Sequence, residues 1–270
     1  MDSWNFFDFA SRDNVLGAVR DQSDQFLALA ARPDAWEAPT AAGHWQVRDV
    51  VGHLVDTTEG YFAGFDTARS GGTAPEPLGV RGMNEHVDRG AVAFRGTSQD
   101  ELLARLHDDR ARMLGILDAL DADEWGGFMV PHKYMGPLPS CFYPVAQLVD
   151  YTVHSWDIRQ GAGHAHAMDG VAADLLVPFC WIVWQSTADC SGVEPFTIGV
   201  RVSGQNGGDT RVTVTPDGIA LEPGDLGDLP LVLEFDPASF VLTAMGRMNA
   251  GTARGDTTIA ERYCGLFFRI

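Results

Sequence analysis

The spacing of hydrophobic residues changes once along the chain, near residues 190–195, and this change limits the possible folds. Before it, apolar residues recur every three or four positions, which is typical of amphipathic helices. After it, segments such as TRVTVTPDG alternate in polarity and are rich in β-branched residues, which favours strands joined by turns. The sequence therefore predicts an α+β protein with a helical bundle over residues 1–190 and a small α+β domain over 191–270.

The hydrophobic pattern also places the individual elements. Helices are expected at about residues 12–31, 46–70, 97–120, 142–160 and 169–188. Thr97 or Ser98 can cap the third of these, whose acidic first turn suits the helix dipole. Segments 71–96 and 126–140 are interpreted as loops bordering the functional site. Four strands within residues 196–236 and two short helices after them are expected in the second domain.

Charge and composition exclude several classes of partner. The net charge is −18, which repels the phosphates of nucleic acids and anionic lipid surfaces. No apolar run reaches the roughly 18 residues that a membrane-spanning helix needs, and the acidic N-terminal sequence is unlike a signal peptide. The four cysteines are scattered and are interpreted as free thiols. We therefore expect a cytoplasmic protein that binds neither nucleic acid nor membranes.

Ionisable residues are concentrated in the segment LVDYTVHSWDIRQG, residues 148–161. Asp150 and His154 are four residues apart, so their Cβ atoms would lie about 5–6 Å apart on one side of a helix. This spacing suits two ligands of one divalent cation. A third ligand must come from elsewhere, and His53 on the helix at 46–70 is the candidate. It lies outside the apolar stripe of that helix, so the three groups could meet at a rim where coordination positions stay open.

A simpler interpretation competes with this one. A polar wedge on an amphipathic helix is most often a solvated face, and a lone histidine is most often a partly buried side chain. Spacing alone does not separate the two interpretations.

Two helical motifs, WQVRDVVGHLV and DYTVHSWDI, resemble the mycothiol-dependent maleylpyruvate isomerase family, which is part of the DinB-like metalloenzyme superfamily. The later LTAMGR…GD resembles the sterol-carrier-like second domain of that family. The resemblance implies a DinB-like four-helix bundle that holds a divalent metal, usually zinc, through His, Glu and His. The corresponding residues are His53, Asp150 and His154. Because Asp is one methylene shorter than Glu, the two helices must approach more closely or a water must bridge Asp150 and the metal. The identity of the metal is therefore left open.

The resemblance also implies the chemistry. A metal with open positions lowers the pKa of a bound thiol or water. No cysteine of the chain has ligand spacing to His53 or His154, so the thiol would be a cosubstrate, and the family points to mycothiol, an actinobacterial thiol. A metal-bound thiolate would then attack an electrophilic, anionic small molecule. An isomerase and a thiol S-transferase share this first step.

Other residues are further candidates for the site. Asp157 either orients an imidazole N–H or faces solvent. Arg247 matches the family's GR position and could hold a substrate carboxylate, or it could pair with Asp256 at the surface. Arg48 and Arg81 are further candidates for cofactor binding. Four other histidines show no spacing to a partner ligand; they are His86, His132, His164 and His166.

Two other functions stay open at this point. The second domain could carry an apolar ligand while the bundle serves as a scaffold, or the metal could supply a hydroxide to a hydrolase that uses no thiol. Chelation would leave a carrier unaffected and would inactivate an enzyme, and assays with and without mycothiol would separate the two enzymes. The oligomeric state and the natural substrate are left open.

Overall fold

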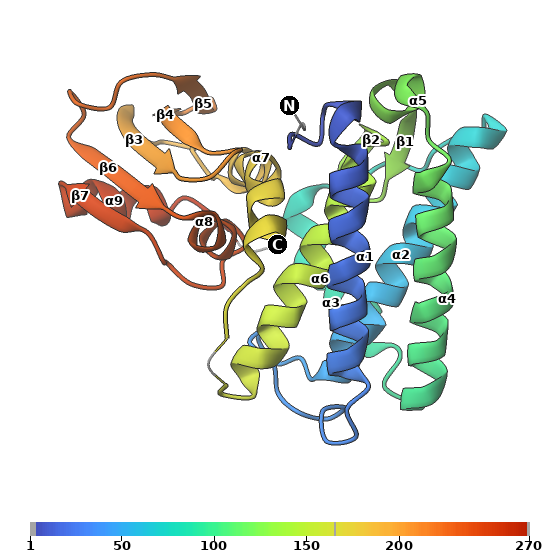
Figure 1. The fold of residues 1–270 in the computed structure, drawn as a ribbon. Coiled ribbons are helices and arrows are strands. Elements are labelled where there is room, and N and C mark those ends of the chain that lie inside the picture. Colours follow the sequence, from blue (N-terminus) through green and yellow to red (C-terminus); the bar gives the residue numbers. More distant parts are fainter. Residues whose placement is uncertain (1–3, 165, 269–270) are drawn as a thin grey trace. The chain divides into compact units, whose positions relative to one another are not determined.

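The computed structural model describes residues 4–164 and 166–268 of the chain (Figure 1). Two compact units are present, Met1–Ala172 and Ala173–Ile270. The first is mainly helical and the second contains a sheet, so the α+β class predicted from the sequence is confirmed. None of the helices in the described part of the chain is long and apolar enough to cross a membrane.

Four long helices form the bundle of the first unit (Figure 1). Helix α6 contacts both α1 and α2, and α4 contacts α1 and α2. Of the two caps that the sequence allows for α4, Ser98 is the observed one, and it accepts a hydrogen bond from the Glu101 backbone N–H. The helical elements are η1 (Phe9–Ser11), α1 (Arg12–Ala30), α2 (Val47–Ser70), η2 (Val80–Gly82), α3 (Met83–Val92), α4 (Gln99–Asp118), α5 (Ala122–Gly127) and α6 (Phe142–Gly161).

Helix α6 is buried on nearly all sides. Its polar residues are buried together with its apolar ones, including Gln147, Thr152, His154 and Asp157. A helix that is buried all round lies inside a protein and has no solvated face. The interpretation of its ionisable residues as a wet face is therefore wrong.

The two segments expected to be loops contain regular structure. Segment 71–96 includes η2 and α3, and segment 126–140 includes the end of α5 and a hairpin of β1 (Met129–His132) and β2 (Gly136–Pro139). Tertiary contacts stabilise both. Helix α3 packs on α2, and the backbone N–H groups of Leu78 and Gly79 donate to carbonyls of the hairpin turn. Such contacts override weak local propensity, which is why the sequence pattern does not reveal these elements.

The second unit is built on a five-stranded sheet with the order β5-β4-β3-β6-β7. Strands β3 and β6 are parallel, and the other neighbouring pairs are antiparallel. The first four strands and both helices were expected from the sequence, whereas β7 was not. The elements are β3 (Phe196–Val202), β4 (Gly208–Thr215), β5 (Gly218–Pro223), β6 (Leu231–Phe235), α8 (Pro237–Ala244), β7 (Thr252–Gly255) and α9 (Thr257–Cys264).

Helix α7 (Gly170–Thr187) contains the division between the two units. Beyond Ala172 it packs into the second unit, where the ring of Trp184 contacts those of Phe240 and Tyr263. Asp174 on the same helix accepts a hydrogen bond from the backbone N–H of Asn206. The compact units thus divide earlier than the change of hydrophobic spacing, and a domain boundary at residue 190 stays a prediction.

Candidate metal centre

His53, Asp150 and His154 meet between α2 and α6. The two helices are antiparallel neighbours, as their cross-contacts show: Gln147 Nε2 donates to Thr58 Oγ1 at 3.2 Å, and the rings of Tyr61 and Tyr143 are 5.0 Å apart. This register puts His53 opposite both residues of α6. One ligand atom from each of the three lies within 4.8 Å of the others.

The three side chains are largely protected from solvent. His53 and His154 are 8% and 6% exposed, and the side chain of Asp150 is 17% exposed. His53 Nε2 lies 3.6 Å from Asp150 Oδ1. The site is thus deeper than the open rim expected from the sequence, because α6 is enclosed by its neighbours.

Each imidazole has a contact that favours one orientation. His154 Nδ1 lies 2.8 Å from Asp157 Oδ2, and the Asp157 side chain is fully buried. His53 Nδ1 lies 3.3 Å from Thr57 Oγ1, one turn along α2. With both Nδ1 atoms engaged in this way, Nε2 is the nitrogen of each ring that can face a cation. Asp157 faces His154 and not solvent, which is the first of the two roles considered for it.

The donor set fits a divalent metal such as zinc. Two imidazoles and a carboxylate are the ligands of many catalytic zinc sites, and three protein ligands leave a position for an exogenous one. Ligands with bonds of about 2.1 Å in a tetrahedral site lie about 3.4 Å from one another. The separation of 3.6 Å between His53 Nε2 and Asp150 Oδ1 is close to that value. The shorter aspartate is therefore compatible with the spacing of the two helices.

Trp45 forms one wall of the centre, which sequence reasoning missed. Its ring lies 5.3 Å from that of His53 and 6.0 Å from that of His154. Trp45 Nε1 donates to Asp88 Oδ1 at 2.8 Å, and His44 Nε2 lies 3.0 Å from the same oxygen. Asp88 belongs to α3, so Trp45 is positioned by a helix within the segment 71–96 that was expected to be a loop. Trp45 is the first residue of the motif WQVRDVVGHLV, and its place there is the signal that could have marked it.

A second group of rings adjoins the centre. Tyr61 and Tyr143 contact His132 of the β1–β2 hairpin, with ring centroids 6.0 and 6.4 Å from it. Burial raises the pKa of Tyr61 well above its usual value, and the Asp150 carboxylate acts in the same direction. Burial lowers the pKa of His132, with Asp150 opposing. No sequence pattern associates His132 with the site, because the residues it contacts there are distant along the chain.

The predicted arginines lie in different surroundings. Arg48 Nη1 is 3.2 Å from Glu37 Oε1, and Arg81 is an exposed residue of η2. Arg247 follows α8 in the second unit, where its Nη1 donates to the Met245 carbonyl at 3.0 Å. The binding roles assigned to the three arginines stay predictions.

The cysteines are poor nucleophiles. Cys141, Cys180 and Cys190 are buried free thiols. Burial raises the pKa of Cys141 to about 11 and also raises the pKa of Cys264. Among the described residues, no cysteine joins the metal-ligand group. A thiolate reacting at this centre would have to come from another molecule.

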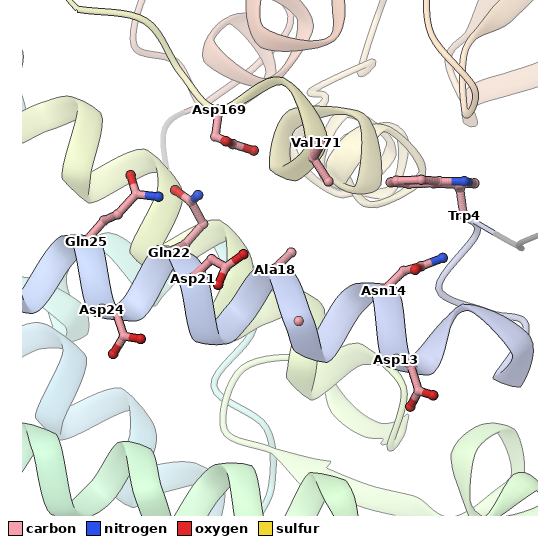
Figure 2. Close-up of a pocket in the computed structure, with 11 residues that line it drawn as sticks. Trp4, Asp13, Asn14, Ala18, Asp21, Gln22, Asp24, Gln25, Asp169 and Val171 are labelled. Carbon is pink, nitrogen blue, oxygen red and sulfur yellow. The ribbon is translucent and has the colours of Figure 1, made fainter.

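A separate cavity of about 520 Å³ is lined by residues of the first unit along α1 (Figure 2). Asp13, Asp21, Asp24 and Asp169 make its lining acidic, with Asp169 and Val171 lying opposite α1. None of the three candidate ligands lines it, and its charge does not suit an anionic substrate.

The chain is similar to known proteins. The family model of the mycothiol maleylpyruvate isomerase N-terminal domain matches residues 16–159, more than half of the chain. The crystal structure of the mycothiol-dependent maleylpyruvate isomerase is 16% identical and aligns over 90% of this chain and 92% of its own, with a TM-score of 0.59. A histidine-to-alanine mutant of that enzyme aligns over the same shares at 14% identity and a TM-score of 0.59. No curated protein matches the chain.

Proposed function

Because the chain belongs to the mycothiol maleylpyruvate isomerase N-terminal domain family, we propose that it is a metal- and mycothiol-dependent enzyme. Its reaction is either an isomerisation or a thiol S-transfer. In both cases a thiolate attacks an electrophilic, anionic small molecule. The single observation that carries the proposal is the convergence of His53, Asp150 and His154 between two helices, within 4.8 Å of one another.

The residues of the chain have distinct parts in this proposal. His53, Asp150 and His154 hold the cation, with zinc as the expected ion. When bound, the cation lowers the pKa of a coordinated thiol so that the thiolate forms near neutral pH. Asp157 keeps the His154 ring in place, and Trp45 closes one side of the centre against water.

The thiol itself comes from outside the chain. Burial raises the pKa values of the four cysteines, which disfavours their thiolates. The family name supplies mycothiol as the cosubstrate. The use of a reduced thiol cosubstrate supports a cytoplasmic location, because low-molecular-weight thiols stay reduced there.

The substrate is the less defined partner. An anionic electrophile needs a cationic group, and Arg247 in the second unit is the proposed carboxylate ligand, with Arg48 and Arg81 as further candidates. Isomerase and transferase differ only after the sulfur–carbon bond has formed. If the bond breaks again after rotation, the product is an isomer; if it persists, the product is a thioether.

Metal analysis of the purified protein tests the proposal. We expect about one zinc per chain in the wild type and loss of zinc in His53→Ala. His107→Ala is the matched control, because His107 is an exposed histidine of α4. The wild type should consume maleylpyruvate or another electrophile only when mycothiol is supplied, and chelation should stop the reaction.

Other results would support other functions. Metal-dependent turnover without a thiol would indicate a hydrolase. An apolar ligand bound equally before and after chelation, without turnover, would indicate a carrier. A wild type that binds no divalent metal would refute the proposal.

A further inference from the structure

Two polar groups beside the candidate metal centre have no hydrogen-bond partner in the described part of the chain. One is the hydroxyl of Tyr61 on α2, a residue that is 8% exposed. The other is Nε2 of His132 in the β1–β2 hairpin. Neither atom is among the polar atoms of the described residues that are sealed from solvent, so both donors are open to a molecule that enters beside the rings.

The Tyr61 hydroxyl differs from the hydroxyls of the buried residues Tyr143 and Tyr151. Tyr143, whose ring contacts that of Tyr61, donates its hydroxyl to the Val130 carbonyl at 3.1 Å. Tyr151 has a sealed hydroxyl oxygen without a partner, whereas the oxygen of Tyr61 is not sealed in this way. The Tyr61 hydroxyl therefore retains access to space beside the rings.

The tautomer of His132 follows from its surroundings. Its Nδ1 accepts from the backbone N–H groups of Tyr134 and Met135, both at 3.3 Å. In a neutral imidazole the other nitrogen then carries the proton, so Nε2–H is a donor. Burial, which lowers the pKa of His132, favours this neutral form.

The two donors share one neighbourhood with the metal ligands. The rings of Tyr61 and His132 are 6.0 Å apart, and the Asp150 carboxylate influences both of them. Tyr61 lies about two helical turns after His53 on α2, and Tyr143 lies about two turns before Asp150 on α6. Tyr61 and His132 thus lie on the side of the centre that faces the β1–β2 hairpin. The ring of Trp45 contacts the rings of the two ligand histidines, His53 and His154.

We propose that the Tyr61 hydroxyl and the His132 Nε2–H together bind the carbonyl oxygen of the electrophilic substrate. This inference rests on the proposed function and concerns substrates whose alkene is conjugated to a carbonyl group. As the thiolate sulfur bonds to the alkene carbon, the π electron pair moves onto the carbonyl oxygen. When that bond breaks, the pair returns. Two fixed neutral donors stabilise the negative charge that develops on this oxygen.

The test uses the zinc-loaded full chain, without thiol, and levulinate, a saturated keto acid that has no alkene for the conjugate addition of a thiolate. Its ketone carries a ¹³C label, so the infrared carbonyl stretch of the bound molecule reports hydrogen bonding directly. We expect a lower stretching frequency on wild-type protein than in water. In Tyr61→Phe the frequency should rise, and the affinity should fall about 5–10-fold, which corresponds to one lost hydrogen bond.

Matched variants separate this role from a structural one. Tyr143→Phe removes a neighbouring hydroxyl that is already used by Val130 and should leave the carbonyl frequency unchanged. His132→Phe should act like Tyr61→Phe, and His132→Gln, which keeps an N–H donor, should restore part of the shift. In turnover, Tyr61→Phe should reduce kcat more than it raises KM, because the charge on oxygen is greatest in the transition state.

The inference is overturned if levulinate does not bind, or if its carbonyl frequency is the same in wild type, Tyr61→Phe and His132→Phe. Failure of the proposed function would look different. It would appear as missing zinc or as thiol-independent turnover in the wild type, whatever the infrared result.

Discussion

Asp157 Oδ2 lies 2.8 Å from Nδ1 of His154, and the Asp157 side chain is completely buried. The Asp157 backbone carbonyl also accepts a hydrogen bond from the Ala41 N–H at 2.9 Å, so the residue is held from two sides. A carboxylate in this position fixes the tautomer and orientation of an imidazole and increases its basicity as a metal ligand. The second histidine of the candidate centre is therefore positioned by its own helix.

Replacing Asp157 with asparagine should weaken metal binding without removing a ligand. We expect the zinc affinity of Asp157→Asn to fall about 10–100-fold, the usual effect of losing such a partner. Competition with a chromophoric chelator measures this. Asp21→Asn, an exposed change on α1, is the control and should bind zinc as the wild type does. Wild-type affinity in Asp157→Asn would show that the contact does not support a metal ligand.

Replacing Asp150 should weaken zinc binding more than replacing Asp157 does, because Asp150 is a proposed metal ligand. Asp150→Asn removes the negative charge of a ligand. It should lower zinc affinity by more than ~100-fold, the upper limit expected for loss of the Asp157–His154 contact. Asp150→Glu restores the carboxylate of the family pattern and should keep zinc bound. The same competition experiment compares both variants. Equal affinities for Asp150→Asn and wild type would remove Asp150 from the site.

The packing of α3 on α2 provides a third prediction, at Gly52. A Cβ at this position would lie 2.5 Å from the Ala91 carbonyl oxygen. In Gly52→Ala, α3 must therefore shift away, and Asp88 moves with it from Trp45. We expect a loss of about 1–3 kcal/mol in unfolding free energy, measured by urea denaturation, together with weaker zinc binding.

Gly60→Ala is the matched control for this change. Gly60 lies on the same helix, and nothing lies within 4 Å of a Cβ built there. Because alanine is the better helix former, this variant should be as stable as the wild type or more stable by up to about 1 kcal/mol. If both variants behaved alike, close packing of α3 at Gly52 would not be important.

The sequence predicted the long elements well, because each carries a repeated hydrophobic pattern. The helix expected at 142–160 is observed at Phe142–Gly161, and the one expected at 46–70 at Val47–Ser70. The convergence of His53 with Asp150 and His154 also followed from the sequence, through helix periodicity and a family resemblance. These inferences depend only on the spacing of residues within each helix and on the assumption that the helices at 46–70 and 142–160 are neighbours.

The surroundings of the centre could not be predicted in the same way. Asp88 reaches Trp45 through a hydrogen bond across 43 positions of sequence, from a short helix without a clear pattern. His132 approaches Tyr61 from a two-stranded hairpin whose strands have four residues each. Such contacts depend on tertiary packing, and no local spacing records them. For the same reason the buried state of α6 was not apparent from its alternation of polar and apolar residues.

Asp109 on α4 should make stability depend on pH. Its Oδ2 is buried without a hydrogen-bond partner. Burial raises the pKa of Asp109 from 3.8 to about 6, Glu59 adds to the effect, and Arg105 and Arg112 oppose it. Because the pKa in the folded state exceeds that of the unfolded chain, the favourable contribution of this group is complete below pH 3.8. It is lost as the pH rises through about 6.

Asp109→Asn removes the carboxylate that the folded state disfavours at high pH. We expect the variant to gain about 1 kcal/mol in unfolding free energy at pH 8, a value reduced from the full shift because the group is partly exposed. The gain should be smaller at pH 5, where the folded wild type is mostly protonated at this position. Urea denaturation of wild type and variant at both pH values measures the difference. Asp108→Asn, at an exposed neighbour, should show no such pH dependence; an equal gain for Asp109→Asn at pH 5 and pH 8 would mean that ionisation of Asp109 is not the cause.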